Sequence, residues 1–136
     1  MSVRSPSLEA KPANPRARLG KLGEDLAAAH LAGLGFRILA RQHRCRSGEV
    51  DLIAEEGDCL CFVEVRARSR GPVTPLESVT LQKQRRIARA AMDYLVQQGI
   101  PAAGARAMRF DVVEIDRQPS GGFEVRLCRN AFEGLE

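Results

Sequence analysis

A chain of 136 residues, 44% hydrophobic and 28% charged, has the size and composition of one globular domain with its own core. Its apolar runs are too short to span a bilayer, and no apolar stretch follows the first residues, so we expect a cytoplasmic protein that does not contact membranes. The four cysteines lack the spacing of a metal finger. Cys59 and Cys61 are expected to be small buried hydrophobic residues, not disulfide partners.

Arginine dominates the positive charge of the chain. The net charge is +4, and of the 21 basic residues only Lys11, Lys21 and Lys83 are lysines. A planar guanidinium binds two phosphate oxygens at once, which suits nucleic acid, although the charge excess alone is modest support. Aromatic residues make up only 4% of the chain, which argues against stacking on unpaired bases. Any nucleic-acid binding is therefore expected to depend on the backbone and its shape.

The N-terminal part divides into an arm and the start of a domain. Residues 1–17 contain three prolines and several basic groups, so we expect a disordered basic arm before a single domain at residues 18–136. A helix is predicted from about Arg18 to Leu34, followed by a strand from Phe36 to His43. The expected apolar stripe of the helix is Leu22, Leu26, Ala29 and Gly33, with Ala27, Leu31 and Leu34 beside it.

Two strands of a hairpin follow. Residues 49–54 and 59–66 alternate with period two and are rich in valine, isoleucine, leucine and phenylalanine. A turn centred on Glu56-Gly57 would place Leu52 opposite Cys61. The face that carries these two residues is entirely apolar and is expected to belong to the core.

The other face of the hairpin carries carboxylates. On this register Asp51 lies across from Phe62 and Glu49 lies across from Glu64. Asp51 and Glu64 are then diagonal neighbours, with Cβ atoms roughly 7 Å apart. Two carboxylates at that spacing can bind one hard cation, so the hairpin predicts an oxygen-ligand site for Mg²⁺.

A loop and a second helix come next. Residues 69–75 contain glycine and proline and are predicted to form a mobile loop that carries Arg70. The helix is predicted from about Leu81 to Gln98, with Thr80 as its N-cap and Gly99 at its end. Its expected buried stripe is Ile87, Ala91, Tyr94 and Leu95.

Polar residues of this second helix fall on two sides. Lys83 and Gln84 precede the buried stripe by one turn and are predicted to face inward, where a polar group needs a partner. The alternative is that both lie in an exposed first turn. Arg85, Arg86 and Arg89 occupy the other faces of the helix.

The C-terminal part predicts two more strands. These are Met108 to Ile115 and Phe123 to Leu127, the second introduced by paired glycines. Asp111 is expected to be structural, since Arg109 on the same strand offers an ion pair. The order of helix, three strands, helix and two strands predicts an α/β fold with a mixed central sheet flanked by helices.

Several motifs in order resemble the YraN family, over about residues 18–132. They are Gly23-Glu24-Asp25-Leu26-Ala27, Gly48-Glu49-Val50-Asp51-Leu52-Ile53, Phe62-Val63-Glu64-Val65-Arg66, Lys83-Gln84, Arg109-Phe110-Asp111-Val112-Val113 and Asn130-Ala131-Phe132. The family is similar to a branch of the restriction-endonuclease-like superfamily close to archaeal Holliday junction resolvases. The resemblance implies a restriction-endonuclease-like fold.

The superfamily motif assigns roles to particular residues. The resemblance makes Asp51 the first acid and Glu64 the second, and we call them the acid pair. It implies that they bind Mg²⁺ or Mn²⁺, with Glu24 as an additional acid. Arg66 stands where the superfamily has lysine, and an arginine stays protonated and can only orient or stabilise charge. This departure either weakens catalysis or gives the lysine role to Lys83.

Each of these residues also has a structural interpretation. The acid pair could be an exposed acidic edge balanced by Arg66 and Arg68. Glu49 could be a further ligand or a partner of Arg46. Glu24 could be an acid favoured by the dipole at the start of its helix.

The resemblance leads to one leading function and two rivals. The leading function is a metal-dependent endonuclease of resolvase type that hydrolyses branched or structured DNA. The rivals are a nucleic-acid-binding module that keeps the fold without turnover, and a scaffold protein. A phosphate track is expected on arginines at Arg68, Arg70, Arg85, Arg86 and Arg89. Since resolvases act as symmetric pairs, a homodimer is expected by analogy.

Overall fold

The computed structural model describes residues 15–68, 79–102, 104 and 106–134. Its elements are α2 (Pro15–Gly33), β1 (Arg37–Cys45), β2 (Gly48–Glu56), β3 (Cys59–Arg68), α4 (Leu81–Gln98), β4 (Met108–Arg117) and β5 (Phe123–Phe132). The strands form one sheet in the order β1-β2-β3-β4-β5. All neighbours are antiparallel except β3 and β4, which are parallel and joined through α4. The predicted single-domain α/β fold with a mixed sheet is confirmed and agrees with a restriction-endonuclease-like fold.

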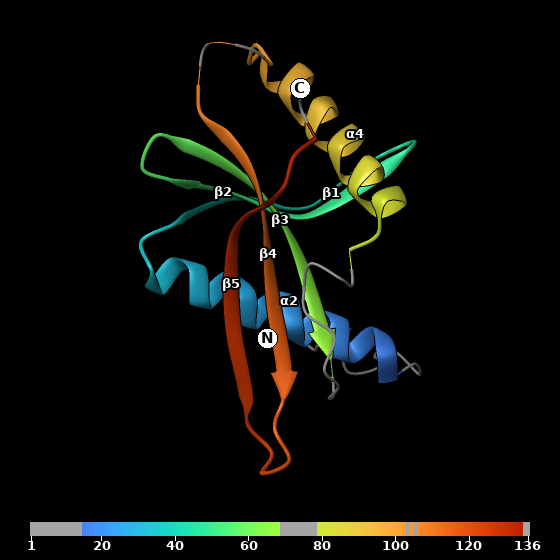
Figure 1. Cartoon of the computed structure of the whole chain (residues 1–136), viewed down its shortest axis with the longest axis vertical. Helices are drawn as coiled ribbons and strands as arrows, with labels where there is room; N and C mark the ends of the chain where they lie inside the picture. Colours follow the sequence, from blue (N-terminus) through green and yellow to red (C-terminus); the bar gives the residue numbers. More distant parts are fainter. Residues whose placement is uncertain (1–14, 69–78, 103, 105, 135–136) are drawn as a thin grey trace, which may run out of the picture.

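The two helices cover opposite faces of the sheet (Figure 1). Alternate residues of β3 show this arrangement, because Phe62 packs in a cluster with Ile87 and Tyr94 of α4. Its neighbours Cys61 and Val63 pack in a second cluster with α2. Both faces of the central strands are thus buried, as expected for strands covered by helices on either side. Neither described helix is both long and apolar enough to cross a membrane.

The hairpin register differs from the prediction. Gly57 and Asp58 form the turn, with Gly57 in a left-handed conformation at φ 58°, so Leu52 pairs with Val63 and not with Cys61. The predicted register was therefore wrong by two residues. A shift of two preserves the face on which each side chain lies. Continuing the observed register by one pair brings Asp51 opposite Glu64.

Helix α2 also departs from its predicted form. It begins at Pro15, before the predicted Arg18, while residues 1–14 of the expected arm lie outside the described residues. The buried positions are Gly23, Glu24, Ala27 and Leu31, so the predicted central stripe was wrong. The helix is turned this way because Gly23 lets it approach the sheet closely: an added Cβ would lie 3.3 Å from the Cβ of Ala67.

Helix α4 matches its prediction in both ends and its buried face. The Thr80 hydroxyl accepts a hydrogen bond from the backbone N–H of Lys83 at 3.1 Å, and Gly99 ends the helix in a left-handed conformation at φ 69°. The buried residues are Ile87, Ala90, Ala91, Tyr94 and Leu95. The predicted loop at 69–75, including Arg70, and the side chain of Arg68 lie outside the described part of the chain.

Candidate active site

The acid pair lines a small pocket between the sheet and α4. Its volume is about 130 Å³, and its walls are Glu49, Asp51, Glu64, Lys83, Arg86 and Ile87. Strands β2 and β3 supply the three carboxylates, and α4 supplies the lysine and the arginine. The structure therefore brings together four of the candidate catalytic or metal-binding residues, and it places Arg86 of the predicted phosphate track beside them. We call this cavity the acid pocket.

Glu64 is the most buried carboxylate of the acid pocket, with only 4% of its side chain exposed. The Lys83 ammonium lies 3.0 Å from Glu64 Oε2, whereas Arg66 Nη1 lies 3.7 Å from the same oxygen. Lys83 thus reaches the pocket and has Glu64 as its partner, while 42% of its side chain remains exposed, so each of the two alternatives for this residue holds in part. Arg66 does not line the pocket, and within the described residues its buried Nε has no hydrogen-bond partner.

Asp51 depends on the backbone of the neighbouring strand. Its carboxylate accepts a hydrogen bond from the N–H of Val65 at 2.8 Å. Burial and, next, the nearby Glu64 charge raise the pKa of Asp51 to about 8, although the Val65 hydrogen bond opposes this rise. Without a cation, Asp51 thus carries a proton at neutral pH. Two carboxylates in one pocket are a suitable oxygen-donor set for a divalent ion, because Mg²⁺ needs only one or two carboxylates in addition to water and substrate oxygens.

Glu24 lies in a different cluster on the α2 side of β1. One of its oxygens accepts from Arg41 Nε at 3.0 Å and the other from Gln42 Nε2 at 2.6 Å. Gln42 reaches it from a left-handed backbone at φ 53°. Glu24 does not line the acid pocket, and the described residues contain no group of three or more histidine, cysteine, aspartate or glutamate side chains placed to hold a metal ion. The buried carboxylate is balanced here by polar partners.

Glu49 and Gln84, the two additional candidates from the sequence, each have a partner within the protein. Glu49 is half-buried at the acid pocket and pairs with Arg44 Nε at 3.3 Å, so the suggested partnership with Arg46 was wrong. Gln84 is half-buried and donates from its side-chain amide to the carbonyl of Val79 at 3.0 Å, outside the pocket. Its inward position is therefore explained by a backbone partner and needs no ligand.

The arginines of α4 line a separate groove. Arg85, Arg86 and Arg89 are exposed, as predicted, and they share a groove of about 520 Å³ with Gln82 and two residues of the β1–β2 turn, Arg46 and Ser47. Sequence reasoning missed Arg46 as part of this surface. Its position in a turn between two strands carries no signal of which helix it approaches.

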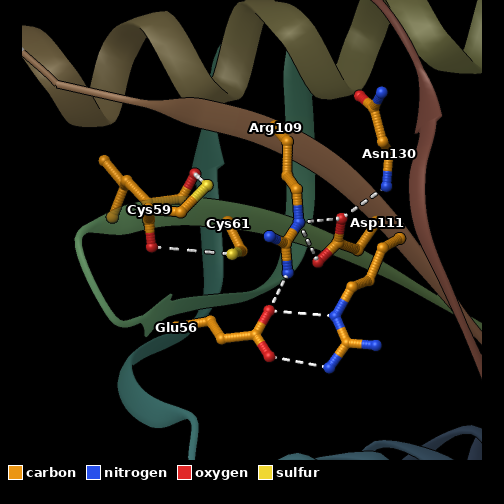
Figure 2. Close-up of polar contacts among 8 residues, drawn as sticks. Glu56, Cys59, Cys61, Arg109, Asp111 and Asn130 are labelled. Atoms are coloured by element: carbon orange, nitrogen blue, oxygen red, sulfur yellow. Dashed lines mark hydrogen bonds and ion pairs between the residues drawn. The ribbon is translucent and has the colours of Figure 1, made fainter.

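Asp111 belongs to a structural network (Figure 2). It is fully buried and accepts hydrogen bonds from Arg109 Nε at 2.8 and 3.1 Å and from the N–H of Asn130 at 2.9 Å. Arg109 also contacts Glu56, which Arg129 binds at 2.7 and 2.9 Å. Both Arg109 and the backbone of Asn130 bind the Asp111 carboxylate, so the predicted ion pair with Arg109 is confirmed.

The two cysteines near this network differ in burial. All four cysteines are free thiols, and Cys61 is fully buried, whereas Cys59 beside it is only half-buried, so the predicted burial of both was right only for Cys61 (Figure 2). Burial raises the pKa of the Cys61 thiol to about 12, which keeps it protonated. Cys61 is the small hydrophobic residue that its place on the apolar face predicted.

Residues 23–115 match the family described as "Uncharacterised protein family UPF0102". The chain belongs to this family. The resemblance to the YraN family, which is the same group, is thereby confirmed. A UPF0102 protein of Symbiobacterium thermophilum is 49% identical over 116 residues, covering 85% of this chain and 96% of the relative. The UPF0102 protein of Geobacter sulfurreducens is 44% identical over 116 residues, covering 85% and 88%.

Among solved structures, this UPF0102 chain has a weak similarity to SfsA of Pyrococcus furiosus in complex with Ca²⁺. The TM-score is 0.40 at 15% sequence identity, and the match covers 84% of this chain and 63% of that chain.

Proposed function

We propose that this UPF0102 protein is a metal-dependent endonuclease of resolvase type that hydrolyses phosphodiester bonds in structured DNA. The observation that carries the proposal is the acid pocket, in which Asp51 and Glu64 lie with Lys83 beside a groove rich in arginine. Two carboxylates close together in a buried pocket are costly to ionise together, so Asp51 keeps its proton in the absence of a cation. A divalent cation taken up with the substrate would allow both carboxylates to ionise, and this favours a metal site in the pocket.

Asp51 and Glu64 are the residues that would hold Mg²⁺ or Mn²⁺. When bound, such an ion polarises the phosphodiester and lowers the pKa of a water molecule. Asp51 must release its proton before it can act as a ligand. The Glu24 carboxylate would have to exchange its contacts with Arg41 and Gln42 for a place at the metal, so the pair alone is the simpler ligand set.

Lys83 takes the position that supports the phosphate. Its ammonium already lies at the acid pair, and a protonated lysine there stabilises the charge that develops on the phosphoryl oxygens. Arg66 lies farther from the shared Glu64 oxygen and cannot accept a proton near neutral pH. Lys83 therefore supplies from α4 the positive charge that the superfamily supplies from the strand.

The second candidate is a nucleic-acid-binding module without turnover. Arg66 in place of lysine is the observation that favours it. The two functions share the arginine groove and differ only in whether the acid pocket performs chemistry.

A cleavage panel separates the two. The parent protein and Asp51→Asn would be incubated with duplex, flap, four-way-junction and RNA substrates, with Mg²⁺, with Mn²⁺ and with a chelator. We expect cleavage of a branched DNA by the parent with either metal, and none by the variant or with the chelator. Binding without cleavage of any substrate by the parent would instead identify the binding module.

A further inference from the structure

The arginine side chains that the structure describes fall into two groups. Most of them lie against a carboxylate, and these are Arg37, Arg41, Arg44, Arg66, Arg106, Arg109, Arg126 and Arg129. Arg117 has no carboxylate partner among the described residues but lies over the ring of Phe123. The others without such a partner are Arg46, Arg85, Arg86 and Arg89, and all of them line one groove.

The described residues that line the groove carry positive charges and no negative one. They are four arginines, with Ser47 and Gln82 as neutral hydrogen-bonding residues, and no carboxylate of the described part of the chain is among them. A solvated helix face usually alternates charges of both signs, so that neighbouring residues neutralise one another. Here four positive charges share a volume of about 520 Å³ without a described counter-charge, which suits a ligand with several negative groups.

The groove is built by a close approach between elements far apart in the sequence. A Cβ added to Gly48, at the start of β2, would lie 1.9 Å from the carbonyl oxygen of Arg86. Only glycine permits this contact between the strand and the backbone of α4. The approach brings the β1–β2 turn, with Arg46 and Ser47, alongside the arginines of the helix.

Arg86 connects the groove with the acid pocket, because it is a lining residue of both. We propose that the groove binds the sugar-phosphate backbone of a polynucleotide next to the bond that is cleaved in the acid pocket, an inference that rests on the proposed function. The substrate class is then a strand of several nucleotides, not a mononucleotide or a phosphomonoester. No aromatic side chain lines the groove, so binding does not depend on stacked bases or on sequence.

Anisotropy titrations in a chelating buffer test this assignment in the absence of cleavage. The probes are fluorescent duplex DNA and duplex RNA of equal length and sequence, titrated at several salt concentrations. The variants are Arg46→Gln, Arg89→Gln and the double variant, and Arg117→Gln is the matched control, since it removes the same charge from an arginine outside the groove. All of these side chains except that of Arg117 lack a described partner, so the variants should fold like the parent, which thermal melts would verify.

Affinity falls as salt rises, and each phosphate contact contributes about 0.9 to the steepness of log affinity against log salt for duplex DNA. Each lost contact should therefore make this dependence shallower by about that amount. We expect the double variant to lose about twice that and Arg117→Gln to bind like the parent. Equal slopes for the groove variants and the control would refute phosphate binding by the groove, whether or not the acid pocket cleaves DNA. Loss of slope in the groove variants of a protein that never cleaves would support the groove while refuting the proposed endonuclease. Comparing the two probes shows whether DNA or RNA supplies the backbone.

Discussion

Lys83 of α4 places its ammonium nitrogen 3.0 Å from a carboxylate oxygen of Glu64, which lies in the buried part of β3. This contact joins the helix that connects the two parallel strands to the strand that carries the second acid of the pocket. Glu64 therefore lies between a lysine of α4 and Arg66 of its own strand, and the lysine is the nearer of the two cations.

The stability of the metal-free protein should fall as pH rises between about 4 and 8. Burial and the Glu64 charge raise the Asp51 pKa from 3.8 to about 8, so the folded protein keeps a proton that the unfolded chain releases. The state that binds more protons loses stability as pH increases, here with a slope of up to about 1.4 kcal/mol per pH unit. Urea unfolding of the parent and of Asp51→Asn across this range measures the effect.

Other groups also titrate over this pH range, so the contribution of Asp51 is measured as the difference between the parent and Asp51→Asn. Asparagine carries no proton to lose, so the difference in unfolding free energy between Asp51→Asn and the parent should grow in favour of the variant as pH rises. A difference that stays constant from acid to mildly basic pH would show that Asp51 ionises normally.

Lys83 and Arg66 should compensate for each other in cleavage. Arg66→Lys should preserve or raise the cleavage rate, because it restores the superfamily residue on the same strand. Lys83→Ala should then slow the parent more than it slows the Arg66→Lys variant, since the new lysine partly replaces the lost one. A double-mutant cycle on single-turnover rates measures this non-additivity.

The matched control for the cycle is Lys21→Ala, which removes an exposed lysine of α2 that pairs with Asp25. Its rate should equal that of the parent in both backgrounds. If Lys83→Ala reduces the cleavage rate by the same factor with and without Arg66→Lys, the two residues do not compensate for each other.

Asp111 should be important for stability and not for metal binding. Asp111→Ala leaves the mostly buried Arg109 guanidinium without one carboxylate and the N–H of Asn130 without its acceptor. Removing one partner of a buried pair costs about 3–5 kcal/mol, so chemical denaturation should show a large loss. The remaining folded protein should bind Mn²⁺ like the parent. A variant as stable as the parent would mean that the network in Figure 2 contributes little.

Local signals predicted the fold well, and pairings between distant residues were missed. The ends of α4 follow from Thr80 and Gly99, whose capping chemistry is local. The turn of the hairpin was misplaced because the apolar alternation of β2 and β3 is unchanged by a shift of two residues. The face that carries Asp51 and Glu64 was right for the same reason.

The candidate site was predictable only in part. Asp51 and Glu64 share one face of the sheet, as the strand period indicated, whereas the place of Lys83 beside them was suggested only by the resemblance. The partners of Glu24 were not predictable, because Gln42 reaches it through a left-handed backbone that is rare for residues other than glycine. The place of Arg46 in the groove depends on tertiary packing at Gly48.

The most direct test is a calorimetric Mn²⁺ titration of the parent, Asp51→Asn and Glu64→Gln near pH 8, where Asp51 has begun to ionise. The control is Glu55→Gln, which removes a carboxylate of β2 that pairs with Arg37 and Arg106 outside the acid pocket. We predict that the parent and the control bind Mn²⁺ alike, that both pocket variants bind it at least tenfold more weakly, and that their folds stay intact. Equal Mn²⁺ binding by the parent and both pocket variants, or none by the parent, would contradict a metal site at Asp51 and Glu64.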